Sequence, residues 1–387
     1  MTPRGEARFG VGAVCAFVLI SVLGAVHLYR VQPTVGGYIA PQYFLDYRDG
    51  FVRRGLPGEL LSVATHPTYA TVRNIGLVLS LLAGAAIVVM AVAARRRAAA
   101  GHGWLALGLV VASPLTLGLL VHDVGRYDGL GFLALALLAL VRVPAAGPRR
   151  VLLLLALSTV LAATVASEEF LLLFLAPVTL LALRGRARPV LLPAAGVAAL
   201  SLAVRPPERL LTSTLARTRS AGAPVLDPNG VDVLRNTLRD QASFVVHFDS
   251  HAIQVFAIVV VLGFYLLTSA ALWALLPSVA PPRSQLLITL YLGAAALATS
   301  VVGVDFRRWW SLALVAVCAC VLRTTPVAVG APAAMSPATT AVSRARQVLA
   351  RHAGLVAPAT AALTVLALLE QNMPITLAWA RVNLIPF

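Results

Sequence analysis

The sequence contains no lysine and has few charged residues of either sign. Its 387 residues include 31 basic side chains, all of them arginine, and 15 acidic ones, so only 12% of the chain is charged while 59% is hydrophobic. Soluble domains typically have about a quarter of their residues charged. Because this chain falls so far below that level, we expect an integral membrane protein that is solvated mostly by lipid.

Cysteine is also scarce. Cys15, Cys318 and Cys320 lie inside or beside apolar runs, where a thiol behaves as a small hydrophobic group. The Cys-x-Cys pair has the wrong spacing for a zinc knuckle, so we expect neither disulfides nor a metal or other cofactor at these residues. The net charge of +16 is not accompanied by a soluble basic face with interleaved aromatic residues. We therefore expect membrane lipids, and not nucleic acid, as the partners of the arginines.

The long apolar runs predict an all-α fold, a polytopic transmembrane bundle of roughly ten to eleven spans. The runs cover residues 10–29, 74–94, 104–121, 127–141, 151–183, 189–204, 253–276, 285–302, 309–322 and 354–369. The first run is long for a signal peptide and is expected to be a retained span. The run 151–183 is too long for one span and holds Glu168 and Glu169 at its centre, which predicts a tight hairpin of two short spans.

Arginines in short loops indicate the orientation of the spans. They recur at every second boundary, at Arg4 and Arg8, Arg95 to Arg97, Arg142 to Arg150, and Arg184 to Arg188. This pattern predicts a cytoplasmic N-terminus. With that topology only Glu6 of the 15 acidic residues falls on the cytoplasmic side. Ionic chemistry is therefore expected at the outer face.

The run lengths also predict the domain organisation. Residues 1–322 form the bundle, with two long outer loops at 30–73 and 205–252, and residues 323–353 form a cytoplasmic linker before a last span and outer tail at 354–387. Long loops in a compact protein are usually functional or disordered. Apolar and charged residues alternate at helical spacing in both outer loops, which favours ordered amphipathic helices.

The first outer loop carries the densest polar motif, Asp-Tyr-Arg-Asp-Gly-Phe-Val-Arg-Arg-Gly at residues 46–55. In a helix the aromatic side chains here would share one face: Tyr43, Phe44, Tyr47 and Phe51. Asp46, Asp49 and Arg53 would share another, which predicts a short interfacial helix that ends at Gly55. Two interpretations remain open. Either Asp49 and Arg53 only pair with each other, or Asp46 is a base and Arg53 or Arg54 holds a lipid phosphate.

Four other polar clusters lie at the predicted outer ends of spans. Their residues are His122, Asp123, Arg126 and Asp128; Glu168 and Glu169; His247 and His251; and Asp305, Arg307 and Arg308. Each has a structural alternative, such as a local salt bridge or, for the tryptophans after Arg308, an aromatic belt. The two histidines could bind a metal, but the motif supplies no third ligand. In the functional interpretation Asp123 or Asp128 faces the loop of Asp46 across an outer cavity. One of the two adjacent glutamates faces the bundle while the other faces the headgroups.

The order of spans and outer loops in residues 1–310 resembles the GT-C class of membrane glycosyltransferases. The segment from Asp46 to Gly55 also resembles a segment of uncharacterised bacterial polytopic proteins. The GT-C resemblance implies that Asp46, or Asp49, is a general base for attack on a sugar linked to polyprenyl phosphate, in the bacterial plasma membrane. The adjacent acidic pair often seen in this class is absent, because two residues separate Asp46 from Asp49.

The same resemblance implies that arginines stabilise the departing polyprenyl phosphate, with Arg53, Arg54, Arg126 and Arg307 as candidates. No nucleotide is needed, in keeping with the lack of a glycine-rich phosphate loop. Two alternatives belong to other classes: a transporter or flippase of a lipid-linked or anionic solute, and a non-catalytic lipid-binding scaffold. Transporters place charges near the bilayer midplane and often contain internal repeats. Here the charges lie at outer ends and no repeat is found, which favours the enzyme.

Overall fold

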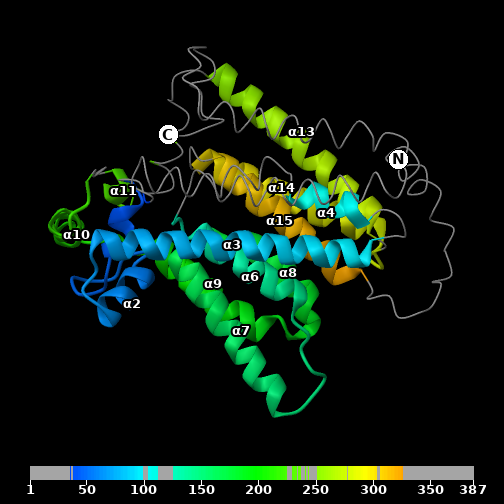
Figure 1. Cartoon of the computed structure of the whole chain (residues 1–387), viewed down its shortest axis with the longest axis horizontal. Coiled ribbons are helices and arrows are strands. Elements are labelled where there is room, and N and C mark those ends of the chain that lie inside the picture. The colour runs from blue at the N-terminus through cyan, green and yellow to red at the C-terminus, as the bar shows by residue number, and fades with distance from the viewer. Residues whose placement is uncertain are drawn as a thin grey trace.

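In the part of the chain that it describes, the computed structural model contains helices joined by turns and no strands (Figure 1). It describes residues 38–98, 103–111, 125–224, 229–232, 251–276, 278–302 and 306–325, together with residue 35 and a few positions between 234 and 243. The predicted spans 10–29 and 354–369 lie outside these residues, as does nearly all of the predicted linker.

Nine apolar helices form a bundle in the described residues. They are α3 (Tyr69–Arg97), α4 (Gly103–Val111), α6 (Asp128–Leu140), α7 (Pro148–Ser167), α8 (Leu171–Leu183), α9 (Arg188–Ala203), α13 (His251–Leu275), α14 (Pro282–Val302) and α15 (Phe306–Thr324). Each coincides with a predicted apolar run. The run 151–183 is divided into α7 and α8 by a short turn, as its length and central glutamates predict.

The helices α3 and α7 are long and apolar enough to cross a membrane, and α9 with α10 (Glu208–Ser220) counts as a third span if the bent pair is taken together. The bend between α9 and α10 is 97°. It follows from Pro206 and Pro207, because proline cannot continue a helix. The helix α6 and the second half of α13 are shorter apolar segments. The full number of spans therefore stays a prediction.

The helix α15 lies at the centre of the bundle. It packs against α3, α6, α8, α13 and α14, and every residue from Trp309 to Leu322 is buried. A helix that is apolar on all sides has no face suited to water and takes the interior position. By contrast, α7 and α9 expose large apolar side chains, among them Leu152 and Leu192 at 67% and 68% exposure. Such outward apolar faces suit contact with lipid.

Arginines gather at one end of the bundle, where the helices α3, α6, α8 and α15 end together. Arg323 donates hydrogen bonds to the carbonyls of Val141, at 2.6 Å, and Ala182, at 2.9 Å, while Arg97 donates to Leu322. The acidic residues that the structure describes belong to the opposite end, where α6, α8 and α15 begin. We call the two ends the arginine end and the acidic end. The fold thus separates the charges as the sequence predicts, and the assignment of the arginine end to the cytoplasm stays a prediction.

The predicted helix over residues 43–53 is wrong. A short 3-10 helix, η1 (Ala40–Phe44), ends before Asp46, and turns follow in which Gly50 and Arg54 have φ angles of +128° and +63°. Left-handed residues interrupt a helix. The helix α2 (Leu56–Ala64) begins directly after Gly55, where the predicted helix was expected to end. Pro57 lies in its first turn, a position where proline is well tolerated.

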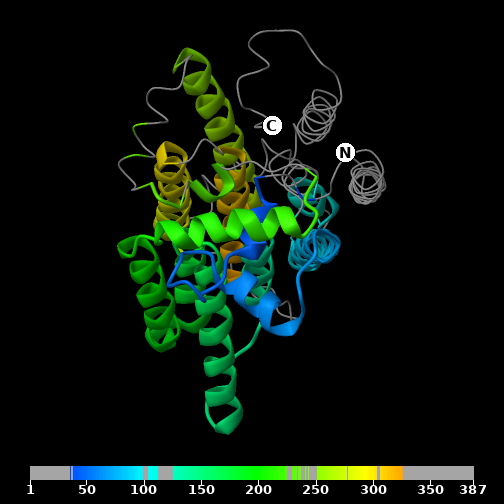
Figure 2. The same cartoon turned by 90° about the vertical axis from the view of Figure 1, so that its left-hand side faces the viewer.

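The two long outer loops pack against each other at the acidic end. α10 and α11 (Asn229–Asp232) both contact η1, and Figure 2 shows α10 lying across the end of the bundle. A small apolar cluster joins the loops: Leu45, Val52, Leu210, Leu211, Val231 and Leu234. Leu210 and Leu211 of α10 belong to this cluster, Arg209 and Arg217 pair with aspartates of the first loop, and Arg219 is exposed, so an amphipathic helix does occur in the second loop.

Candidate functional site

Six charged side chains form a buried network beneath the two outer loops, which we call the ion cluster. Its members are Arg53, Arg54, Asp128, Glu168, Glu169 and Arg308, each at most 7% exposed. They come from the first outer loop, the start of α6, the turn between α7 and α8, and the start of α15. Sequence reasoning names all six as candidates, and the fold brings them together.

The pairs form a continuous chain of opposite charges. Arg53 Nη1 lies 3.3 Å from Glu169 Oε1, and Arg54 Nη2 lies 3.3 Å from the same oxygen and 2.8 Å from Glu168 Oε1. Glu168 Oε2 in turn lies 2.6 Å from Arg308 Nη2. Burying charges is costly unless they are paired and hydrogen-bonded. Glu168 meets this condition by joining two guanidinium groups.

Arg308 completes the chain on the α15 side. Its Nε lies 2.9 Å from the carboxylate of Asp128, and its guanidinium carbon lies 4.0 Å from the centre of the Trp309 ring. Stacking on an aromatic face adds a cation–π attraction that favours arginine over lysine. The cluster has three positive and three negative groups and is neutral overall.

Local backbone geometry places the two glutamates. Both lie in the turn between α7 and α8, and Glu168 has an extended conformation with φ −157°. The prediction that one of them faces the headgroups is wrong, since each is only 3% exposed. That prediction assumed helical spacing of about 100° per residue. In a turn, two neighbouring side chains can point the same way.

The pKa values of the glutamates move in opposite directions. Burial raises the pKa of Glu168 above its ordinary value, although Arg308 and Arg54 oppose that change. Burial also acts to raise the pKa of Glu169, but the attraction of Arg54 and Arg53 outweighs it and the pKa falls below its ordinary value. Within this pair Glu168 accepts a proton more readily.

A second layer of ion pairs joins the two outer loops above the ion cluster. Asp46 is 2% exposed, pairs with Arg217 of α10, and lies 3.5 Å from Arg48 Nε. Arg217 and Arg48 are themselves 30% and 62% exposed. The carboxylate of Asp46 is thus covered, while the guanidinium groups beside it reach the surface.

Asp49 makes the second connection to α10. Its carboxylate accepts hydrogen bonds from the Ser213 hydroxyl at 2.9 Å and from Arg209 Nη2 at 3.1 Å. The bond from Ser213 lowers the pKa of Asp49 most, burial opposes it, and Arg209 lowers it further. The predicted pairing of Asp49 with Arg53 is wrong, because Arg53 binds Glu169. Asp49 and Arg53 of the first loop therefore bind α10 and the bundle, respectively, and not each other.

Sequence reasoning missed the residues of α10. Arg209, Ser213 and Arg217 are spaced four residues apart, so they share one helical face opposite the two aspartates of the first loop. That spacing was the available signal. The chain separation between Asp46 and Arg217 is 171 residues, which hides the pairing from local pattern analysis.

Two tyrosines connect the first loop to the start of α6. Tyr43 donates its hydroxyl hydrogen to the carbonyl of Gly125, and its ring centre lies 5.0 Å from that of Tyr127. The Tyr127 hydroxyl is buried, with no hydrogen-bond partner among the described residues. The guanidinium carbon of Arg126 lies 5.7 Å from the centre of the Tyr38 ring. Asp128 pairs with Arg308 and so belongs to the ion cluster beneath the loop that carries Asp46.

The remaining candidates cannot be placed. His122, Asp123, His247 and Asp305 lie outside the described residues, as do the side chains of His251 and Arg307. Within the described ranges no group of three histidine, cysteine, aspartate or glutamate residues could hold a metal ion. Cys318 and Cys320 are buried free thiols in α15.

The site therefore combines three chemical properties. It has a covered carboxylate at Asp46 and partly exposed guanidinium groups beside that carboxylate. The ion cluster beneath them fixes the loop that carries Asp46. A covered carboxylate can take a proton, and exposed guanidinium groups can bind the oxygens of a phosphate.

Comparison with known proteins places the chain among membrane proteins. A family model described as "Uncharacterised membrane protein Rv1490" matches residues 11–219, which include the first outer loop, the two glutamates and α10 but not Arg308. No curated protein and no solved structure matches the chain. Since the matched residues make up more than half of the sequence, the chain belongs to the Rv1490 family of uncharacterised membrane proteins.

Proposed function

We propose that the protein is a membrane glycosyltransferase of the GT-C type that transfers a sugar from a polyprenyl-phosphate donor to an extracytoplasmic acceptor. In this proposal it spans a bacterial plasma membrane ten to eleven times, by the count of apolar runs, with its N-terminus in the cytoplasm. The observation that carries the proposal is the position of Asp46. Its carboxylate is covered, and the two guanidinium groups nearest to it reach the surface of the acidic end.

Asp46 acts as the general base. The acceptor hydroxyl attacks the anomeric carbon of the sugar, the bond from that carbon to the phosphate oxygen breaks, and the proton of the hydroxyl moves to the Asp46 carboxylate. The electron pair of the broken bond stays on the polyprenyl phosphate. General bases of this kind typically contribute about 10²–10⁴-fold to rate.

Arg217 and Arg48 bind the donor phosphate. Both pair with Asp46 when no substrate is bound, so an arriving phosphate competes with the carboxylate for the same guanidinium groups. When Arg217 turns to the phosphate, the Asp46 carboxylate is released from this ion pair and can accept the proton of the acceptor hydroxyl. The base is thus activated only when the donor is present.

The ion cluster positions this machinery. Arg53 and Arg54 are held by Glu169 and Glu168, so in the proposal they fix the loop while Arg217 and Arg48 take the phosphate. Both clustered arginines were phosphate candidates on sequence grounds. Their engagement with buried carboxylates supports the positioning role instead.

The test is turnover in proteoliposomes that contain the full chain and radiolabelled polyprenyl-phosphate hexoses and pentoses. Release of polyprenyl phosphate is measured in the presence of cell-envelope acceptors. We expect Asp46→Asn to lower the initial rate by about 100-fold or more while donor binding persists. Arg217→Gln is expected to weaken donor binding about tenfold, the size of a charge-assisted hydrogen bond.

Asp232→Asn is the matched control, since Asp232 is an exposed aspartate of the acidic end whose one ion pair in the described residues is with Arg235, three residues further along the chain. It should turn over like the unaltered protein. Equal turnover in the Asp46 variant would remove Asp46 as the base, absence of turnover in the unaltered protein would favour a scaffold, and donor movement across the vesicle without cleavage would favour a flippase. Each of these results overturns the proposal.

A further inference from the structure

Six arginines at the arginine end have no acidic partner in the part of the chain that the structure describes. They are Arg142, Arg149, Arg150, Arg184, Arg186 and Arg188. No aspartate or glutamate occurs in residues 142–167 or 170–207. Arg150 and Arg186 donate hydrogen bonds only to backbone carbonyls in the described structure, those of Ala145 at 3.0 Å and Pro144 at 3.3 Å. The surface here is therefore strongly positive and would attract an anion from outside the protein.

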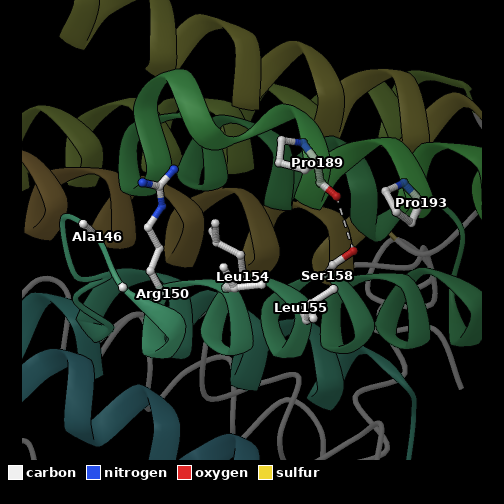
Figure 3. Close-up of a pocket in the computed structure, with 9 residues that line it drawn as sticks. Ala146, Arg150, Leu154, Leu155, Ser158, Pro189 and Pro193 are labelled. Carbon is white, nitrogen blue, oxygen red and sulfur yellow. Dashed lines mark hydrogen bonds between the residues drawn. The ribbon is translucent and has the colours of Figure 1, made fainter.

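An apolar groove begins among these arginines. It has a volume of about 590 Å³ and lies between the first half of α7 and the start of α9 (Figure 3). Its walls include Val151, Leu154 and Leu155 of α7. At the inner end the Ser158 hydroxyl donates to the Pro189 carbonyl at 3.5 Å, which joins the two helices. A groove of this size is within the range that small-molecule ligands occupy.

Arg150 stands at the mouth of the groove. Figure 3 shows its guanidinium group pointing away from its own helix toward the opposite wall. The carbonyls that Arg150 and Arg186 contact belong to neighbouring residues of the loop before α7, so the two guanidinium groups meet the same short segment. The first turn of α7 contains no acidic residue, and a helix N-terminus adds further positive potential.

We propose that this groove binds an anionic phospholipid from the leaflet at the arginine end. One acyl chain lies against Val151, Leu154 and Leu155, and the phosphate contacts Arg150, with Arg186 beside it. Basic pockets between transmembrane helices are known to bind anionic headgroups. The described residues that line the groove include no carboxylate to receive a choline or ethanolamine cation, which selects an anionic lipid over a zwitterionic one. This site is separate from the proposed sugar-transfer site at the acidic end.

Native mass spectrometry of the full chain in detergent micelles tests the proposal. Dioleoyl phosphatidylglycerol and dioleoyl phosphatidylcholine are titrated in parallel, and bound-lipid adducts are counted. The double variant Arg150→Gln/Arg186→Gln should weaken phosphatidylglycerol binding about 25-fold, at about fivefold for each arginine near an anionic headgroup. Ser158→Phe fills the groove with an aromatic ring and should reduce binding about tenfold, the transfer value of one or two buried methylene groups.

Arg219→Gln is the matched control, because Arg219 is an exposed arginine of α10 at the acidic end. It should leave phosphatidylglycerol binding unchanged. Equal binding of both lipids, or equal loss in the Arg219 variant, would overturn the proposal. Loss in the arginine variant without loss in Ser158→Phe would also overturn it, since the headgroup would then bind without the groove. Displacement of the lipid by millimolar inorganic phosphate would assign the site to free phosphate instead.

Discussion

Removing the charge of Glu168 tests whether the ion cluster holds the acidic end together. Glu168→Gln keeps the size of the side chain and leaves the cluster with one uncompensated positive charge. Glu168 lies 2.8 Å from Arg54 and 2.6 Å from Arg308 and is 3% exposed. No other carboxylate of the cluster pairs with guanidinium groups from both the first loop and α15.

The size of the effect follows from this burial. A pair of unit charges about 4 Å apart interacts by about 4 kcal/mol at an effective dielectric constant of about 20. Glu168 has two such partners, and the new amide recovers part of the loss by hydrogen bonding. Breaking a buried ion pair from one side typically costs about 3–5 kcal/mol, and we expect the unfolding free energy to fall by that amount.

Unfolding in mixed micelles with rising sodium dodecyl sulfate provides the assay. Tryptophan fluorescence reports on the cluster, because Trp309 stacks on Arg308. Glu208→Gln is the control. The Glu208–Arg235 distance is 2.7 Å, nearly that of Glu168–Arg308, but these side chains are 66% and 42% exposed. An exposed pair contributes about 0–1 kcal/mol.

A double variant separates charge from packing. Glu168→Gln/Arg308→Gln restores neutrality, so it should cost less than the sum of its single variants by about 1–3 kcal/mol. The reasoning is refuted if Glu168→Gln costs less than about 1 kcal/mol, a surface-pair value. Additive single and double variants would equally refute it.

Three further outcomes are expected. Gly58→Ala should cost several kcal/mol in unfolding free energy, about the upper range for point variants, because its Cβ would lie 1.9 Å from the Leu45 carbonyl oxygen. Gly196→Ala, inside α9 with open space around it, should instead stabilise by about 0.5–1 kcal/mol in the same assay, through the higher helix propensity of alanine. Tyr43→Phe should cost about 1–3 kcal/mol by leaving a buried carbonyl without its donor, and an equal cost for an exposed tyrosine would contradict this. The folded pKa of Asp49 lies below its ordinary 3.8, so its contribution to loop packing is present above that pH and disappears as the pH falls through the lower value. Limited proteolysis of the outer loops across this range should show the change, and Asp49→Asn should abolish that pH dependence.

The sequence alone determined the helices and the separation of charge between the two ends. Apolar runs such as 74–94 and 189–204 became α3 and α9, and the central glutamates divided 151–183 into α7 and α8. These features are local, since the length of an apolar run and the residues that interrupt it decide whether a helix forms and where it ends. All six members of the ion cluster were also identifiable as charged residues in the first outer loop or at the outer ends of apolar runs.

Only the tertiary structure decided which charges meet. Glu168 is 114 residues from Arg54 along the chain, and Asp46 is 171 residues from Arg217. Helical spacing within the first loop predicted a pairing of Asp49 with Arg53, but left-handed backbone at Gly50 and Arg54 removed that spacing. Pairings of this kind depend on how helices pack around α15, because a buried charge takes whichever partner the fold brings within reach. Local sequence patterns specify the available charges, and packing specifies their partners.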